Sequence, residues 1–457
     1  MTGYRLSSVD PFDAACNRDG CINLGTAENK LCWAALQQKL AADAECGHAA
    51  LLPEDGCYGD FSGAPHFREQ LAALLTTHMR PSRGPLRADD LVVANGCGSL
   101  LEMWAHCVAD RGDAVLVPAP YYGGFDVDLR KRAGVEIAPC ALGGAGDGGW
   151  ALTEAALEAG MTAWQQQQRH TGGGKVRGLL LTNPHNPLGI THDAAALGCA
   201  LRFAKRHALH VLVDEIYLLS LFDDEARAAF RPALSLTDGG GDDDAIDWSR
   251  LHVLWGFAKD FGASGFRVGV LATYNPALRE AMSQLAYFHL VPAPMQRALA
   301  AVLHDGPWVA RFVATNQAAL RRAQQEVFEG LSPLLDMLAQ TPDGSWAVPA
   351  GGAGHGGGVR IRAVPAVGGL YTWLDLSDVL LPGTAEELVA DELRLWKELI
   401  TAGVYLAPGQ AFHNAEPGWF RIIFSVQEDV MRLATARIVA TVEARAAAKS
   451  KVHRATV

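Results

Sequence analysis

The sequence predicts an α/β fold with a mostly parallel central sheet flanked by helices, and a smaller α+β domain after it. Short apolar runs at 178–181, 209–213, 251–255 and 266–272 are bounded by glycine or polar residues. Runs of this length are typical of buried strands. Helical spacing of apolar residues extends over 277–329, and strand and helix patterns alternate again from residue 369 onward. Strand and helix patterns that share one chain in this way predict an α/β fold.

Composition fits a globular enzyme of two domains. The chain has 457 residues, 49% hydrophobic and 19% charged, and a net charge of −11, which argues against a nucleic-acid partner. No stretch approaches the roughly 18 apolar residues of a membrane span, and the N-terminus lacks the apolar core of a signal peptide. Nine cysteines without a C-x-x-C pair indicate reduced thiols and no zinc site. We therefore expect a cytoplasmic enzyme without a membrane or nucleic-acid partner.

The first 57 residues are predicted to form an arm and a helix. Apolar residues recur at helical spacing over 31–44, and Glu28 precedes them. An acidic residue at this place stabilises a helix start through the helix dipole. A substrate contact is the other interpretation of Glu28.

The stretch 94–108 is predicted to be a strand end, a glycine turn and a helix. The backbone N–H groups at such a helix start bind anions. Cys97 and Gly98 would contact a phosphate through the main chain, and Ser99 is an optional hydroxyl contact. Cys97 is disfavoured as a nucleophile, because nothing near it in the sequence supplies a base.

Four polar side chains follow apolar runs in chain order. They are Asn186, Asp214, Tyr217 and Lys259. Parallel sheets gather residues at strand ends along one edge, where ligands bind. Lys259 lies in a glycine-rich loop, and partial desolvation there would lower its pKa and make it nucleophilic. Taken alone, this loop also fits a surface lysine in a turn.

Together these residues fit the needs of pyridoxal 5'-phosphate (PLP). A lysine forms the Schiff base with its aldehyde, and a carboxylate keeps the pyridine nitrogen protonated so that the ring accepts electrons. Hydrogen-bond donors hold the ring hydroxyl, and an arginine with a glycine turn holds the phosphate. We predict Lys259, Asp214 and Tyr217 as catalytic and cofactor-binding residues, and Arg267 as a phosphate contact.

Seven stretches carry a family resemblance. They are INLGTAENKLCW (22–33), PAPYYGGFDVDLR (118–130), GLLLTNPHNPLG (178–189), VDEIY (213–217), AKDFGASGFRVG (258–269), GGLYTWLDL (368–376) and APGQAFHNAEPGWFRIIF (407–424). The chain resembles the PLP-dependent class I/II aminotransferases of fold type I, within them the 1-aminocyclopropane-1-carboxylate (ACC) synthase-like branch. The resemblance implies an amino-acid substrate and a homodimer with a shared active site.

The resemblance also implies roles for single residues. Tyr122 would stack on the pyridine ring, and Asn186 would bind the ring hydroxyl. Glu28 would lie beside the substrate, and Tyr58 would reach the phosphate in the partner subunit. Arg421 would bind the substrate α-carboxylate, because its guanidinium matches two oxygens.

The sequence departs from the family pattern near the predicted site. Phe61 stands where ACC synthases carry a tyrosine, and it has no hydroxyl to donate. Gly98 replaces a more frequent threonine, while Gly256 and Ala258 replace serines of the lysine loop. We expect phosphate binding to depend on Arg267 and on the backbone N–H groups of Gly96 to Ser99.

Two loops carry no predicted function. The acidic loop 237–247 lacks the spacing of a calcium loop, and 341–368 reads as a glycine-rich insert that includes a solvated His355. Predicted domains are an arm with part of the small domain (1–57), a large PLP-binding domain (58–300) and a connector helix with the small domain (301–457).

The predicted function is PLP-dependent chemistry through an amino-acid α-carbanion. The favoured activity is that of an ACC synthase-like carbon–sulfur lyase or aminotransferase of secondary metabolism. A true ACC synthase acting on S-adenosylmethionine and a non-catalytic PLP-binding protein are the alternatives.

Overall fold

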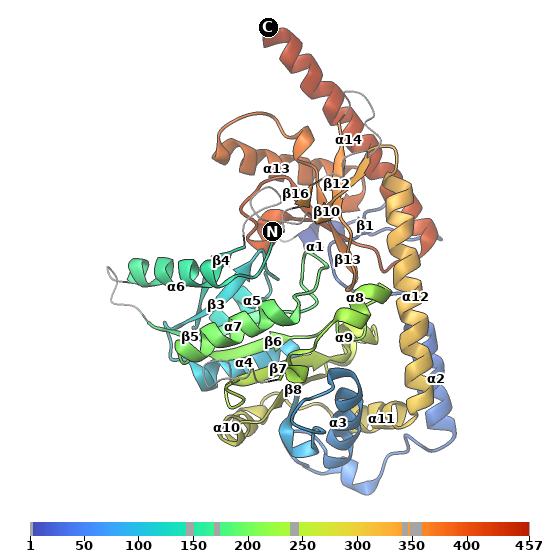
Figure 1. Ribbon diagram of the computed structural model, residues 1–457. Helices are drawn as coiled ribbons and strands as arrows, with labels where there is room; N and C mark the ends of the chain where they lie inside the picture. Colours follow the sequence, from blue (N-terminus) through green and yellow to red (C-terminus); the bar gives the residue numbers. More distant parts are fainter. Residues whose placement is uncertain are drawn as a thin grey trace.

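The computed structural model describes residues 3–142, 150–168, 174–237, 246–340, 346–347 and 359–456. Its largest element is a seven-stranded sheet of order β2-β8-β7-β6-β5-β3-β4 (Figure 1). The strands are β2 (Leu91–Ala94), β3 (Ala114–Ala119), β4 (Glu136–Ala141), β5 (Val176–Thr182), β6 (His210–Asp214), β7 (Leu251–Gly256) and β8 (Gly269–Thr273). Among these seven strands β8 alone runs antiparallel to its neighbours, so the prediction of a mostly parallel sheet is confirmed.

Helices cover both faces of this sheet. In β6, Val211 and Val213 pack on one face and Leu212 on the other, so the middle of the strand is apolar on both faces. The first face packs against α3 (Pro65–Met79), α6 (Glu154–Gln168), α7 (Ala194–Arg206) and α11 (Ala293–His304). The second packs against α4 (Cys97–Val108), α5 (Phe125–Arg130) and α10 (Pro276–Ala286).

A second sheet of five strands has the order β15-β16-β13-β12-β9. Its strands are β9 (Leu335–Met337), β12 (Ile361–Val364), β13 (Tyr371–Asp375), β15 (Ala407–Pro408) and β16 (Trp419–Ile423), and α13 (Ala385–Thr401) and α14 (Glu428–Thr456) pack nearby. The N-terminal strand β1 (Ile22–Asn23) pairs with β14 (Val404–Tyr405) beside it. A hairpin of β10 (Ala339–Gln340) and β11 (Trp346–Ala347) lies outside both sheets.

One long helix, α12 (Gly306–Leu331), joins the two halves (Figure 1). Its first half packs into the core of the seven-stranded sheet through Phe312, and its second half packs into the other core through Leu320 and Val327. The domain boundaries at 57 and 300 stay a prediction. The remaining helices are α1 (Gly3–Ser7), α2 (Trp33–Glu45), α8 (Asp224–Ala229) and α9 (Phe257–Asp260).

Three local predictions need correction. Lys259 lies in the four-residue helix α9 and not in a loop. The strand predicted from residue 266 begins at Gly269, because Ser264–Phe266 form a 3-10 turn and Arg267 follows it with φ +54°. The helical pattern over 277–329 is three helices, α10, α11 and α12, and not one.

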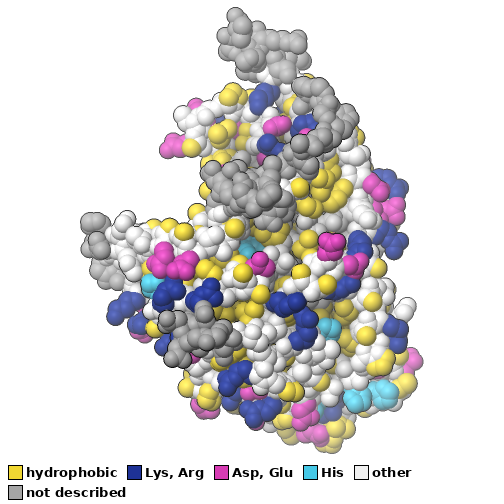
Figure 2. Space-filling model, in the orientation of Figure 1, with side chains coloured by type: hydrophobic (Ala, Val, Ile, Leu, Met, Phe, Trp, Pro, Cys, Tyr) yellow, Lys and Arg dark blue, Asp and Glu magenta, His cyan; other side chains and the backbone are white. Residues whose placement is uncertain are grey.

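Other expectations concern the two loops without a predicted function, membrane-spanning helices and surface charge. Most of both loops predicted to lack a function, 238–245 and 341–345 with 348–358, lies outside the described residues, as does His355. Within the described ranges, no helix is long and apolar enough to cross a membrane. On the face shown in Figure 2, basic side chains lie among acidic ones and form no large patch of one sign.

Candidate active site

The candidate site lies where β5, β6 and β7 end. Thr182, Asp214 and Leu254 are register partners across these three parallel strands, so the residues that follow them share one edge. A cavity of about 450 Å³ opens there. Ten of the thirteen predicted site residues line it, namely Glu28, Cys97, Gly98, Tyr122, Asn186, Asp214, Tyr217, Lys259, Arg267 and Arg421.

Lys259 lines this cavity and is half-buried. Its Nζ donates a hydrogen bond of 2.5 Å to the backbone oxygen of Ala27. Burial, with help from the positive charge of Arg421, lowers the pKa of Lys259 to about 8. A lysine with this pKa has a far larger neutral fraction at pH 7 than an exposed one, which is the property that a nucleophilic amine needs.

Asp260 fixes the short helix that carries Lys259. Its carboxyl group accepts hydrogen bonds from Leu219 N (3.0 Å), Ser220 Oγ (2.6 Å) and Trp255 Nε1 (2.8 Å). The helix is thereby tied to the turn that follows Tyr217. The sequence prediction missed Asp260, although a carboxylate beside a lysine in an apolar stretch was a usable signal.

Asp214 is a buried acid at the end of β6. Burial raises its pKa to about 7, although the N–H group of Ile216 donates to it at 3.1 Å and acts in the opposite direction. The residues around it therefore compensate little of its charge. A protonated pyridine nitrogen would supply that compensation, so Asp214 fits the role predicted for it.

Arg421 forms the opposite wall, from β16. It is only 4% exposed, and its Nη1 and Nη2 donate to Asn186 Oδ1 (2.9 Å) and Gly25 O (2.8 Å). The rings of Phe412 and Tyr371 lie 4.7 and 5.3 Å from its guanidinium carbon. Its Nε has no hydrogen-bond partner in the described structure. A buried guanidinium with an unpaired donor beside a cavity fits an anionic ligand such as a carboxylate.

The segment from Gly25 to Glu28 closes the cavity between the two sheets. Its backbone oxygens accept hydrogen bonds from Arg421, Lys259 and Ser425. A Cβ atom at residue 25 would lie 2.3 Å from the ring of Tyr405, so glycine is required there. The sequence prediction assigned only Glu28 from this segment, because backbone contacts leave no residue-type signal.

The other end of the cavity is built around the first turn of α4. Gly96 has φ +107°, and a Cβ atom on it would lie 2.5 Å from Nη2 of Arg267. Glycine at this position therefore lets Arg267 lie across the helix start. Burial raises the pKa of Cys97 well above its ordinary value, so this thiol is not ionised at neutral pH and is a poor nucleophile.

Tyr122 and Tyr217 both line the cavity, but Tyr217 is buried and Tyr122 is exposed. Tyr217 is buried and packs edge-on against Tyr371 at 5.3 Å. Tyr122 is 42% exposed at the mouth, with its ring over Gly124. The proposed stacking of Tyr122 on a bound ring stays a prediction.

Three predicted residues do not line this cavity. The hydroxyl of Ser99 is bonded to Asn95 Oδ1 at 2.5 Å, within its own turn. Phe61 packs edge-on against Tyr287 at 5.2 Å, and Tyr58 is 89% exposed. The roles predicted for all three residues stay predictions.

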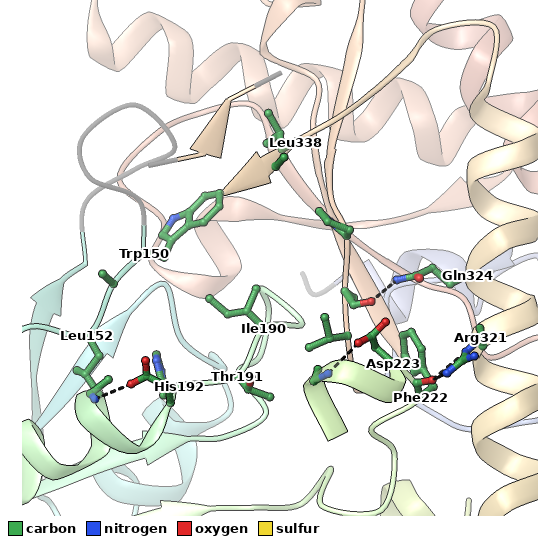
Figure 3. A pocket seen from close by; sticks show the side chains of 18 of the residues that line it. Trp150, Leu152, Ile190, Thr191, His192, Phe222, Asp223, Arg321, Gln324 and Leu338 are labelled. Atoms are coloured by element: carbon green, nitrogen blue, oxygen red, sulfur yellow. Dashed lines mark hydrogen bonds between the residues drawn. The ribbon is translucent and has the colours of Figure 1, made fainter. Parts of the chain in front are cut away.

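A larger cavity, of about 840 Å³, contains none of the predicted site residues (Figure 3). It lies between the loop of Ile190 and His192, the helix α8 and the side of α12. Two of its polar side chains are bonded within the protein, since Gln324 donates to Ala366 O at 2.8 Å and Arg321 donates to Phe222 O. The ten predicted site residues that line a cavity all line the smaller one.

Comparison with known proteins agrees with this arrangement. Residues 19–438 match the family described as aminotransferase class I and II. The chain is 35% identical over 435 residues to 1-aminocyclopropane-1-carboxylate synthase 3 of Oryza sativa subsp. japonica, covering 93% of this chain and 88% of that protein. It is 34% identical over 441 residues to the Homo sapiens protein named probable inactive 1-aminocyclopropane-1-carboxylate synthase-like protein 2, covering 95% and 69%.

Among solved structures, the aromatic aminotransferase of Pyrococcus horikoshii has a TM-score of 0.70 at 20% identity, covering 97% of this chain and 99% of that one. This likeness shows the fold, which is the fold type I architecture that the sequence predicted.

Proposed function

The chain belongs to the PLP-dependent class I and II aminotransferase family, and on this premise we propose that it is an ACC synthase-like enzyme that removes the α-proton of an amino acid. The favoured activity is that of a carbon–sulfur lyase or an aminotransferase. One observation carries the proposal: a half-buried amine with a lowered pKa, a buried acid with a raised pKa and a buried arginine with an unpaired donor share one cavity.

Each of these residues has a defined task. Arg421 binds the substrate carboxylate through its free Nε and through donors now bonded to Asn186 and Gly25. Asp214 holds the proton of the pyridine nitrogen by its negative charge. Bound PLP supplies an electron sink for the negative charge that develops at the α-carbon. Lys259, as a neutral amine, accepts the α-proton at Nζ.

Enclosure of the site favours this proton transfer. The segment from Gly25 to Glu28 covers the cavity from the N-terminal side, and the carbonyl of Ala27 holds Nζ of Lys259 in place at 2.5 Å. A water-poor cavity strengthens the electrostatic interactions within it. The same enclosure limits competing reactions with water.

The reaction after proton removal depends on the leaving group of the substrate. A sulfur group at the β-carbon would leave, as in a carbon–sulfur lyase, and a substrate without a leaving group would be transaminated with a keto acid. A γ-sulfonium would allow ring closure, as in an ACC synthase. Phe61 lacks the hydroxyl of the tyrosine in that branch, which argues against a true ACC synthase.

A screen of substrates separates these activities. The purified protein is mixed with a cysteine conjugate, with S-adenosylmethionine, or with an amino acid and a keto acid. Release of pyruvate and ammonia, formation of ACC, and reversible conversion of the cofactor to its amine form identify the lyase, the synthase and the aminotransferase respectively. If PLP binds and the α-proton of no amino acid exchanges with deuterated solvent, the protein is a non-catalytic PLP-binding protein and the proposal is wrong.

We also propose a homodimer that works in the cytoplasm. Tyr58, exposed at 89%, and the neighbouring exposed rings of Tyr287 and Phe288 support a surface that a second copy covers. Sedimentation of the protein at several concentrations tests this, and a monomer at micromolar concentration would contradict it.

A further inference from the structure

Asp128 is an acidic side chain at the anion-binding end of the cavity. It belongs to α5 and lines the cavity together with Gly98 and Arg267. Its Oδ1 lies 2.8 Å from the point where a Cβ atom at residue 98 would stand. The carboxyl group therefore occupies the space that a side chain at position 98 would need. Glycine at 98 and aspartate at 128 fit one another sterically.

The carboxyl group of Asp128 has little to compensate its charge. Within the described chain it has no hydrogen-bond partner, and Arg267 is the cation that acts on it. Burial raises the pKa of Asp128 to about 6, Arg267 lowers it and Glu102 raises it. The other titratable groups that act on this end of the cavity are Cys97, Tyr122 and Asp214.

A dianionic phosphate at the start of α4 would lie against this acid. An ionised carboxylate there would repel the phosphate, whereas a neutral acid would donate a hydrogen bond to it. Replacing Gly98 by the threonine frequent in the family would place a hydroxyl in the same space. Asp128 thus stands where the missing donor would be.

We propose that Asp128 is a cofactor-binding residue that contacts the phosphate of PLP as a neutral acid, with its proton shared with a phosphate oxygen. This inference rests on the proposed function only in that PLP binds in this cavity. Its consequence is a proton linkage. Bound phosphate raises the pKa of Asp128 above its value in the free protein, so affinity is full below the free value and falls as the pH rises through it.

The test compares wild type with Asp128→Asn, which keeps a donor and cannot ionise. Dissociation constants for PLP are measured from the absorbance of the bound cofactor between about pH 6 and about pH 9. Relative to Asp128→Asn, wild type should lose affinity with rising pH, by about tenfold for each unit by which bound phosphate raises the pKa of Asp128. Pyridoxal without phosphate should show no such divergence.

Two further variants complete the test. Gly98→Ala should displace the carboxyl group, weaken PLP binding and remove most of the pH-dependent loss, and it serves if Asp128→Asn does not fold. Asp89→Asn removes a carboxyl that is 83% exposed and should behave as wild type. Parallel pH profiles for wild type and Asp128→Asn, or the same divergence with pyridoxal, would overturn the proposal. A wild-type protein that binds no PLP would instead overturn the proposed function.

Discussion

The two ends of the active-site cavity are built in different ways. At the carboxylate end, Arg421 is buried in β16 and held by Asn186 and Gly25, which come from the other sheet's edge and from the N-terminal segment. At the proposed phosphate end, the first turn of α4 offers backbone N–H groups, and Gly96 leaves room for Arg267. Among the described residues, Arg267 donates only to the nearby Ser264 O, at 3.1 Å. Both ends join segments far apart in the sequence, but the first is held by hydrogen bonds between them and the second by the close approach of Arg267 to Gly96.

Under the proposed function, Arg421 marks the end that is prepared for the substrate. Three segments far apart in the sequence meet at Arg421, so its orientation is fixed before any ligand binds. The proposed phosphate end has fewer side-chain contacts and several glycines. Binding of a phosphate there would therefore depend on backbone geometry and charge. Substitutions should therefore change substrate binding at one end and cofactor binding at the other.

The largest effect is expected where the two ends meet, at Lys259. Lys259→Ala removes both the covalent attachment and the base, so turnover should fall by about 10³-fold or more. The visible absorbance of bound PLP should shift to that of the free aldehyde. Lys397→Ala, at an exposed lysine of α13, is the control. An unchanged spectrum in Lys259→Ala would place the cofactor lysine elsewhere.

At the carboxylate end, Arg421→Lys keeps the charge and loses the forked donors. Loss of one charge-assisted hydrogen bond costs about 1.5–3 kcal/mol, so KM should rise by about 10- to 100-fold. The dissociation constant of PLP should change far less, because the phosphate lies at the other end. Steady-state kinetics and a PLP titration measure the two effects, with Arg432→Lys on the surface as control. Equal losses in both would contradict the division of the cavity.

At the phosphate end, Gly256→Ser restores the residue that the family carries. A Cβ atom there would lie 2.8 Å from Val268 O and 3.0 Å from Cys97 Sγ. Because backbone cannot easily move aside, we expect a loss of about 1–3 kcal/mol in the free energy of unfolding of the apo protein, measured by denaturant. Gly265→Ser, where no atom lies within 4 Å of the new Cβ, should be neutral. Greater stability in Gly256→Ser would show that this end has room for the serine.

The smallest expected effect is that of the Arg421 charge on the pKa of Lys259. Since the pKa of Lys259 is lowered to about 8, its neutral fraction rises through pH 8, and the rate at which apo protein captures PLP should level off above it. An ordinary lysine would level off only near pH 10.4. Arg421→Gln removes a positive charge that lowers this pKa, so the midpoint should move upward. A stopped-flow titration of apo protein measures it, and a downward shift would refute the coupling.

The sequence alone determined the fold and most of the site. Apolar runs of strand length followed by Asn186, Asp214 and Lys259 were enough to predict a parallel sheet with its polar edge, because strand direction decides where such residues gather. The seven family stretches predicted Arg421 on a late strand, and it lines the same cavity. These features depend on residue type and order, which a sequence records directly.

Only the tertiary structure decided how the cavity is completed. The backbone oxygens of Gly25 and Ala27, the bonds from Leu219 and Ser220 to Asp260 and the approach of Asp128 to Gly98 join residues that the sequence keeps apart. Contacts through backbone atoms carry no residue-type signal, and a carboxylate has its pKa set by its neighbours in space. Burial and distance, which decide both, exist only once the two sheets have packed together.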